Sequence, residues 1–253
     1  MPTPISNYWR VAQEPRYSLI FGLPLLLAYE VLALSLSGYE IAGVRNGADV
    51  LVKSLFLALG GREGLIAFGV VLLGGGAWLV WKDYRRSRSI HSGIFALMAA
   101  ESVLCALVFG LVTGTLTGFL LPGLTTMGDA SSLGINSMAA WSLPTQLMIS
   151  LGAGIYEELL FRVILVAGLA WLGRRVFSWS ATGSGVFAVI VGALIFSAFH
   201  YVGPYGDRLE LGSFTFRAVA GVLFSGLYLL RGFGITAWTH ALYDVFLAVG
   251  VIG

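Results

Sequence analysis

The stretch GIYEELLFRVIL, residues 154–165, places two adjacent glutamates and an arginine inside a long apolar run. Each ionisable side chain at the centre of a bilayer costs about 2.5–3.5 kcal/mol on insertion scales. Such residues persist where partners neutralise them or where they carry a function, so an ionisable residue in an apolar run is a candidate site residue by default.

The composition of the whole chain is that of a membrane protein. Of its 253 residues, 57% are hydrophobic and 11% are charged, and the mean hydropathy is +0.86. Soluble domains contain about 45–50% apolar and about 25% charged residues. The net charge of +2 is spread over loops and gives no basic footprint for nucleic acid. We therefore expect an all-α, polytopic membrane bundle whose surroundings are the lipid bilayer.

Seven apolar runs are long enough to cross a bilayer, which takes about 20 residues. They are residues 18–38, 64–81, 92–121, 143–172, 183–202, 213–230 and 233–252. Between the first two, NGADVLVKSLFLALGG is amphipathic and too charged to cross, so we expect a short helix at the interface or against the bundle. Since no linker divides the chain, the sequence predicts a single integral-membrane domain, 1–253, of about seven transmembrane helices plus this short helix.

The basic clusters WKDYRRSRS and GRR predict the orientation, because cytoplasmic loops are enriched in Lys and Arg. Both clusters fall on the side of the N-terminus, which we therefore place in the cytoplasm. The first 17 residues lack the pattern of a signal peptide, and the first apolar run is long enough to be a retained membrane helix.

Several glycines and two glutamates in the apolar runs are interpreted as structural residues. Gly110, Gly114 and Gly118 recur every four residues and predict a helix-packing stripe. Glu30 and Glu101 have no oppositely charged residue at helical spacing, so we interpret both as structural or snorkelling residues. The only cysteine, Cys105, cannot form an intrachain disulfide.

The spacing of the charged residues in EELLFR separates the roles of the two glutamates. Glu158 and Arg162 are four residues apart, on one face of an α-helix, and are well placed to form an ion pair. With about 100° per residue, Glu157 points about 140° away from Arg162. The preceding turn carries Ala153 and Gly154, so we expect room beside the Glu157 carboxylate for water or substrate. Glu157 is therefore a candidate general base.

Two more apolar runs carry ionisable residues. FSAFH ends the fifth run with His200, and WTHALYD places His240 and Asp244 four residues apart in the last run. A helical bundle can bring these residues and the glutamates together in its interior. Taken singly, His200 could be an interfacial residue, and the His240–Asp244 pair could be a packed interhelical hydrogen bond.

In this order, EELLFR, FSAFH and HALYD resemble the EExxxR, FxxxH and HxxxN/D motifs of the CPBP family. That family comprises CAAX prenyl endopeptidases and bacteriocin-processing or self-immunity proteins, described as intramembrane glutamic proteases. The motifs lie within residues 143–252, and the first 140 residues carry no matching motif. The resemblance implies a multi-pass protein of a prokaryotic plasma membrane that hydrolyses a peptide bond in a membrane-anchored or prenylated protein. Asp244 stands where many CAAX-processing members have Asn, which puts the CAAX substrate itself in doubt.

The resemblance also implies roles for the residues. Glu157 and His200 would hold and deprotonate a water molecule, without a cofactor, and the Glu158–Arg162 pair would support them. His240 and Asp244 would donate to the oxyanion or orient its donors. An ionised Asp cannot donate a hydrogen bond, so we expect His240 to be the donor and Asp244 to orient it.

Three alternatives remain at this point. Glu157, His200, His240 and Asp244 are all possible zinc ligands, although the sequence contains no HExxH motif. The protein could instead be a non-catalytic self-immunity protein or scaffold that retains the motifs. Intramembrane Glu, His and Asp residues also build proton-coupled transporters, but no pair of broken helices recurs in two halves of this chain.

Overall fold

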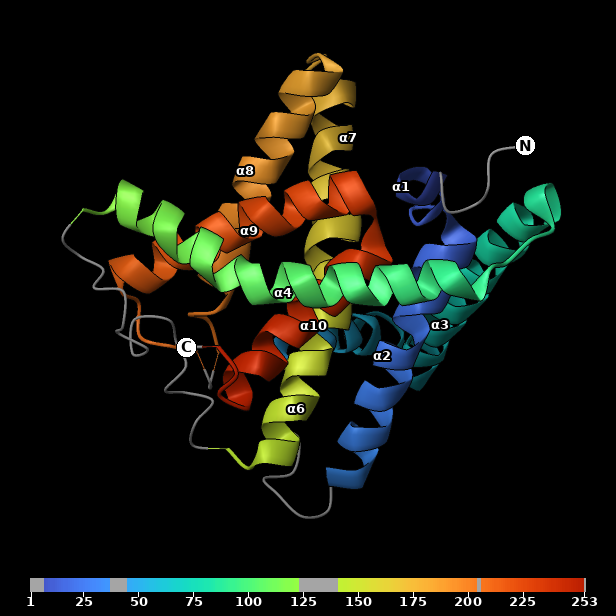
Figure 1. The fold of residues 1–253 in the computed structure, drawn as a ribbon, viewed down its shortest axis with the longest axis horizontal. Coiled ribbons are helices and arrows are strands. Elements are labelled where there is room, and N and C mark those ends of the chain that lie inside the picture. The colour runs from blue at the N-terminus through green and yellow to red at the C-terminus, as the bar shows by residue number, and fades with distance from the viewer. Residues whose placement is uncertain (1–6, 37–44, 123–140, 204–205, 253) are drawn as a thin grey trace.

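A computed structural model describes residues 7–36, 45–122, 141–203 and 206–252, and Figure 1 shows how the helices are arranged. The helical elements are α1 (Tyr8–Val11), α2 (Pro15–Leu36), α3 (Gly47–Ser87), α4 (Ser92–Leu120), α6 (Leu143–Gly152), η3 (Ala153–Glu157), η4 (Leu159–Val166), α7 (Ala167–Arg175), α8 (Ala181–Phe199), α9 (Leu211–Arg231) and α10 (Phe233–Ala248). No strand occurs among the described residues. The predicted all-α fold is confirmed.

Five of these helices, α2, α3, α4, α8 and α9, are long and apolar enough to cross a membrane. Four successive helical segments, α6 to α7, cover the run expected at 143–172, and α10 has only 16 residues. A helical membrane bundle is therefore confirmed, and the number of seven crossings stays a prediction.

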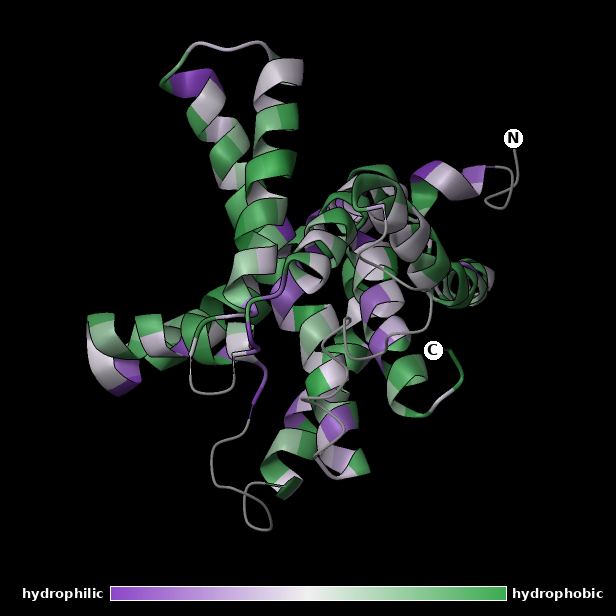
Figure 2. Cartoon of the chain, turned by 90° about the vertical axis from the view of Figure 1, so that its left-hand side faces the viewer, coloured by the Kyte–Doolittle hydropathy of each residue, from purple (hydrophilic) through white to green (hydrophobic). Residues whose placement is uncertain are grey.

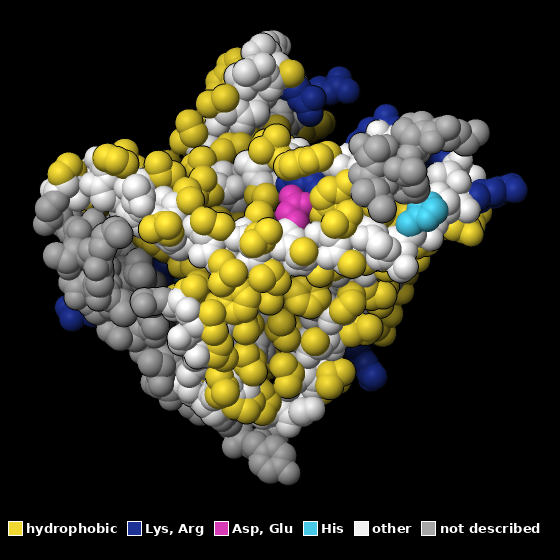
Figure 3. Space-filling view, viewed as in Figure 1, with side chains coloured by type: hydrophobic (Ala, Val, Ile, Leu, Met, Phe, Trp, Pro, Cys, Tyr) yellow, Lys and Arg dark blue, Asp and Glu magenta, His cyan; other side chains and the backbone are white. Residues whose placement is uncertain are grey.

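The outer surface of the bundle is mainly apolar. Figure 2 shows hydrophobic residues along most of the helix surfaces, with hydrophilic residues near helix ends and in the middle of the molecule. On the face shown in Figure 3, hydrophobic side chains dominate and most of the visible Lys and Arg side chains lie at the margins. This distribution suits a chain surrounded by lipid, whose polar groups face one another inside or reach water at the helix ends.

The short helix expected at residues 46–61 is not a separate element. It forms the first part of α3 and continues into the following span through a kink at Gly60 and Gly61. Gly61 has φ of +58°, a conformation that glycine adopts without steric cost. Beyond the kink the Phe68 ring packs 5.0 Å from the Phe56 ring, centroid to centroid. The amphipathic part therefore lies against the bundle, where Val52 is buried.

The last helix, α10, lies at the centre of the bundle, where it packs against α2, α4, α6, η3 and α9 (Figure 1). Small residues allow this close packing. A Cβ added at Gly154 would lie 2.4 Å from the Ala237 carbonyl oxygen and 2.6 Å from the Ala241 Cβ. The space at Gly154 is therefore filled by α10, and this glycine provides no room for water or substrate, whereas room beside the Glu157 carboxylate itself stays a prediction.

The predicted glycine stripe on α4 packs closely at Gly110 but not at Gly114. A Cβ at Gly110 would lie 3.0 Å from the Tyr243 ring of α10, whereas Gly114 has no such neighbour within 4 Å. The i, i+4 spacing locates small residues, but it does not say which of them meets another helix.

Glu101 has partners that helical spacing could not reveal. The Arg231 guanidinium binds both carboxylate oxygens, with N–O distances of 2.6 and 2.7 Å, and the Tyr8 hydroxyl donates to Glu101 Oε2 at 2.5 Å. Burial and the adjacent carboxylate raise the pKa of the Tyr8 hydroxyl, which keeps it a neutral donor. This cluster joins α1, α4 and the end of α9, so Arg231 is a structural residue and not a free loop charge.

The contact at Gly154 gives a test of the central packing. We expect Gly154→Ala to lower the free energy of unfolding by about 1–3 kcal/mol, as overpacking does, because its methyl group meets the backbone of α10. The matched control is Gly226→Ala on α9, where no atom outside the local helix lies within 4 Å. Unfolding of both variants in detergent should separate them, and equal stabilities would contradict this packing.

Candidate active site

The helix that carries both glutamates departs from regular α geometry. Residues Ala153–Glu157 and Leu159–Val166 are π-helical, with Glu158 between the two segments. Stretches of π-helix are rare and are frequently found at functional sites. The rotation of about 100° per residue that applies to an α-helix therefore does not hold in this segment. The predicted ion pair between Glu158 and Arg162 is nevertheless present.

Glu158 is fully buried and both of its oxygens face partners. Its Oε2 lies 3.1 Å from the Arg162 Nε, and its Oε1 accepts a hydrogen bond from the His240 Nδ1 at 2.7 Å. The Arg162 guanidinium lies over the Phe196 ring at 4.4 Å and near the Phe224 ring at 5.3 Å. Glu158 thus ties its own helix to α10 and cannot reorient freely.

Glu157 is bound differently. Its Oε1 accepts a hydrogen bond from the Asn46 Nδ2 at 2.8 Å, and its Oε2 lies 3.9 Å from the His200 Nε2. Within the described part of the chain, Glu157 Oε2 is buried and has no hydrogen-bond partner. One oxygen of this carboxylate is therefore held, while the other is available to a further group.

His200 faces the available oxygen of Glu157 with a ring nitrogen that can accept a hydrogen bond. It lies at the C-cap of α8, and its Nδ1 is 2.9 Å from the Phe196 carbonyl oxygen. A carbonyl only accepts, so Nδ1 carries the hydrogen. In the neutral ring Nε2, which faces Glu157, is then an acceptor.

His240 is oriented by a residue that the sequence did not suggest. Asp244 was expected to fix its ring, but the His240 Nδ1 donates its hydrogen bond to Glu158, and Asp244 Oδ2 lies 3.7 Å from Nε2. The ring also stacks on Phe224, with centroids 4.3 Å apart. Since an ionised Glu158 can only accept, Nδ1 carries a hydrogen, and Nε2 carries a second one only in the imidazolium form.

The structure thus brings together the six residues singled out in the sequence, namely Glu157, Glu158, Arg162, His200, His240 and Asp244. It adds Asn46, the N-cap of α3, which was missed. The Asn-Gly-Ala-Asp stretch is recognisable as a helix start, with Asn as the cap and Asp in the first turn. Nothing local points to its partner, which lies 111 residues away.

The donor geometry does not match a zinc site. No group of three or more His, Cys, Asp or Glu side chains in the described ranges is arranged to hold a metal ion. Asn46 occupies one Glu157 oxygen, and Arg162 and His240 occupy those of Glu158. Zinc dependence remains an alternative, which removal of metal ions with a chelator tests.

Residues 139–246 match the family model described as Rce1-like, type II CAAX prenyl endopeptidase. The matched segment contains all six residues of the predicted motifs, and Asn46 lies outside it. Comparisons with curated proteins and with solved structures returned no match. The resemblance indicated by the three motifs is confirmed, because this part of the chain is similar to type II CAAX prenyl endopeptidases.

The buried ion pair yields a stability prediction. Arg162→Leu leaves the Glu158 carboxylate without its cation, and breaking a buried pair typically costs about 3–5 kcal/mol. We expect a large drop in the unfolding temperature in detergent. Arg174→Leu, at an exposed position on α7, is the control and should change it little. Similar unfolding temperatures for the two variants would contradict the structural role of Arg162.

Proposed function

On the premise that residues 139–246 are an Rce1-like domain, we propose that the protein is a glutamic endopeptidase in which Glu157 and His200 activate water. One observation carries this proposal. The buried Glu157 Oε2, without a hydrogen-bond partner in the described chain, faces the His200 Nε2 across 3.9 Å.

The separation of these two atoms suits a water molecule that contacts both. Hydrogen bonds of about 2.8 Å to each atom are possible when the water lies to one side of the line joining them. The Glu157 carboxylate removes the proton as the water oxygen attacks the peptide carbonyl, and His200 accepts the second hydrogen bond of the water. The protonated Glu157 then delivers its proton to the leaving amine.

In this proposal His240 stabilises the oxyanion that the attack creates. Its Nδ1 is hydrogen-bonded to Glu158, so its Nε2 points in a fixed direction. When the ring is an imidazolium, Nε2 carries a hydrogen that it can donate to the oxyanion. Glu158 and Asp244 lie at the two ring nitrogens and favour this charged form. A preorganised donor of this kind acts without reorganisation when charge develops on the substrate oxygen.

The apolar exterior suggests where the substrate is encountered. The chain is a multi-pass membrane protein, and we propose that it cleaves a membrane-anchored or lipidated protein or peptide that reaches the site from the bilayer. We keep the prokaryotic plasma membrane with a cytoplasmic N-terminus as part of this proposal, because the basic clusters support it. A non-catalytic self-immunity or scaffold protein would show no cleavage in the following tests.

Glu157→Gln tests the proposed base. The amide keeps the size of the side chain but cannot take a proton, so we expect no cleavage of a farnesylated CAAX peptide or of a peptide with a transmembrane tail. The variant should insert and purify normally. Glu63→Gln, at an exposed position of α3, is the matched control and should keep wild-type turnover. Near-normal turnover of Glu157→Gln would reject this assignment.

Variants of His240 and Asp244 test the oxyanion assignment. Removing one oxyanion donor costs about 10²–10³ in kcat, so His240→Ala should turn over slowly with nearly unchanged KM. Asp244→Asn should be milder, since its amide oxygen still accepts a hydrogen bond.

The same kinetics measured with a chelator and with added Zn²⁺ separate this mechanism from the zinc alternative. We expect wild-type cleavage to persist in the chelator. Loss of cleavage in Asp244→Asn that added zinc restores would show that these residues are metal ligands and that the oxyanion assignment is wrong.

A further inference from the structure

The start of α3 reaches Glu157 from outside the family match. Asn46 is 3% exposed and uses both ends of its amide. Its Oδ1 accepts from the Ala48 backbone N–H at 2.9 Å, and its Nδ2 donates to Glu157 Oε1 at 2.8 Å. The orientation of the amide follows from its partners, because a backbone N–H only donates and a carboxylate only accepts.

Close packing on two sides holds Asn46 in place. A Cβ at Gly152 would lie 2.6 Å from the Asn46 Cβ and 2.6 Å from the Tyr29 ring. Only glycine therefore lets α6 approach α2 and the start of α3 this closely. On the other side, a Cβ at Gly47 would lie 3.2 Å from the Phe199 ring, next to His200. The start of α3 is thus wedged between the helix of Glu157 and the end of α8.

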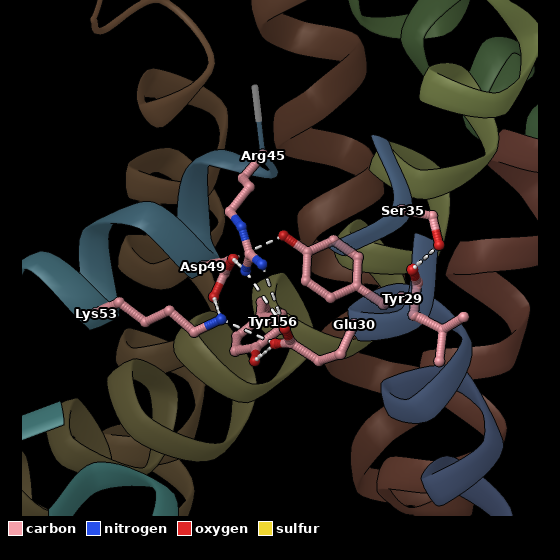
Figure 4. A network of polar contacts seen from close by, with 8 residues as sticks. Tyr29, Glu30, Ser35, Arg45, Asp49, Lys53 and Tyr156 are labelled. Atoms are coloured by element: carbon pink, nitrogen blue, oxygen red, sulfur yellow. Dashed lines mark hydrogen bonds and ion pairs between the residues drawn. The ribbon is translucent and has the colours of Figure 1, made fainter. Parts of the chain in front are cut away.

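A polar network on α2 and α3 fixes this start further (Figure 4). Asp49, in the first turn of α3, is fully buried and accepts from the Tyr29 hydroxyl at 2.7 Å. Arg45 at 2.8 Å and Lys53 at 2.6 Å pair with the same carboxylate. The first turn of α3 is therefore anchored to α2 directly beside Asn46.

The network also reaches the residue that precedes Glu157. Glu30 of α2 accepts from the Tyr156 hydroxyl at 2.7 Å and pairs with Lys53 at 2.8 Å (Figure 4). The two carboxylates of the network, Glu30 and Asp49, are matched by two cations, so the cluster offers no free charge for a ligand. It fixes the backbone at Tyr156 and the start of α3 to the same part of α2.

We propose that Asn46 is a positioning residue for Glu157. Its amide holds Oε1 through a hydrogen bond to a charged acceptor and so directs Oε2 toward His200. Without this bond no hydrogen bond from the described residues holds the Glu157 carboxylate, and the reacting oxygen loses its fixed position. The inference rests on the proposed role of Glu157 and assigns part of the reaction geometry to the N-terminal half of the chain.

Asn46 also caps α3, and a suitable variant separates the two roles. Serine is as good an N-cap as asparagine, but its hydroxyl is too short to reach Glu157. We expect Asn46→Ser to keep the N-cap and the wild-type KM and to lose only the stability of the hydrogen bond to Glu157, while kcat falls about 10–100-fold, as a misplaced reacting group does. Asn46→Ala loses both the cap and the donor, so it should lose more stability.

Ser180→Ala is the matched control, because Ser180 caps α8 by accepting from the Gly183 N–H at 3.1 Å and is exposed. This variant should lose some stability and keep wild-type kcat. Wild-type kcat in Asn46→Ser, with Glu157→Gln inactive, would overturn the positioning role and leave the proposed function intact. Turnover in Glu157→Gln would overturn both together.

Discussion

A carboxylate enclosed by apolar helices has to be neutralised, and Glu158 is neutralised from two sides. Arg162 pairs with it from the same helix and His240 donates to it from α10. Removing one partner from such a buried pair is far more costly than removing a surface charge. The position of α10 relative to the helix at 143–175 is therefore linked to this one group, and so is the direction in which the His240 ring points.

The adjacent carboxylate has the opposite character, although it lies on the same π-helical stretch. One oxygen of Glu157 is held by Asn46 and the other has no hydrogen-bond partner among the described residues. In the proposed mechanism the neighbours separate a structural carboxylate, Glu158, from a reactive one, Glu157. Glu158 would fix the proposed oxyanion donor, while Glu157 would be positioned by an amide that α2 and α3 hold in place. In this account the first 60 residues complete the geometry of a site whose motifs all lie in the second half of the chain.

The sequence predicted what depends on local spacing or on composition. The all-α membrane fold followed from the apolar runs, and the Glu158–Arg162 pair followed from its i, i+4 separation. Contacts between distant segments were not predictable in this way. Glu101 looked unpaired because Arg231 is 130 residues away, and Asn46 was missed because its partner is 111 residues away. The sequence also assigned the orientation of His240 to Asp244, the nearest candidate on its own helix, whereas His240 donates its hydrogen bond to Glu158 on another helix. At Gly154 the sequence showed a small residue but not that α10 fills the space beside it.

The measurement that tests the central claim most directly is a double-mutant cycle on kcat with Asn46→Ser and Glu157→Asp. Aspartate keeps a carboxylate but is one methylene shorter, so the carboxylate no longer reaches the Asn46 amide or its position beside His200. If Asn46 acts through Glu157, the double variant should be about as slow as Glu157→Asp alone, because the contact is already lost. Rate losses that multiply in the double variant would show that the two residues act independently and would contradict this account.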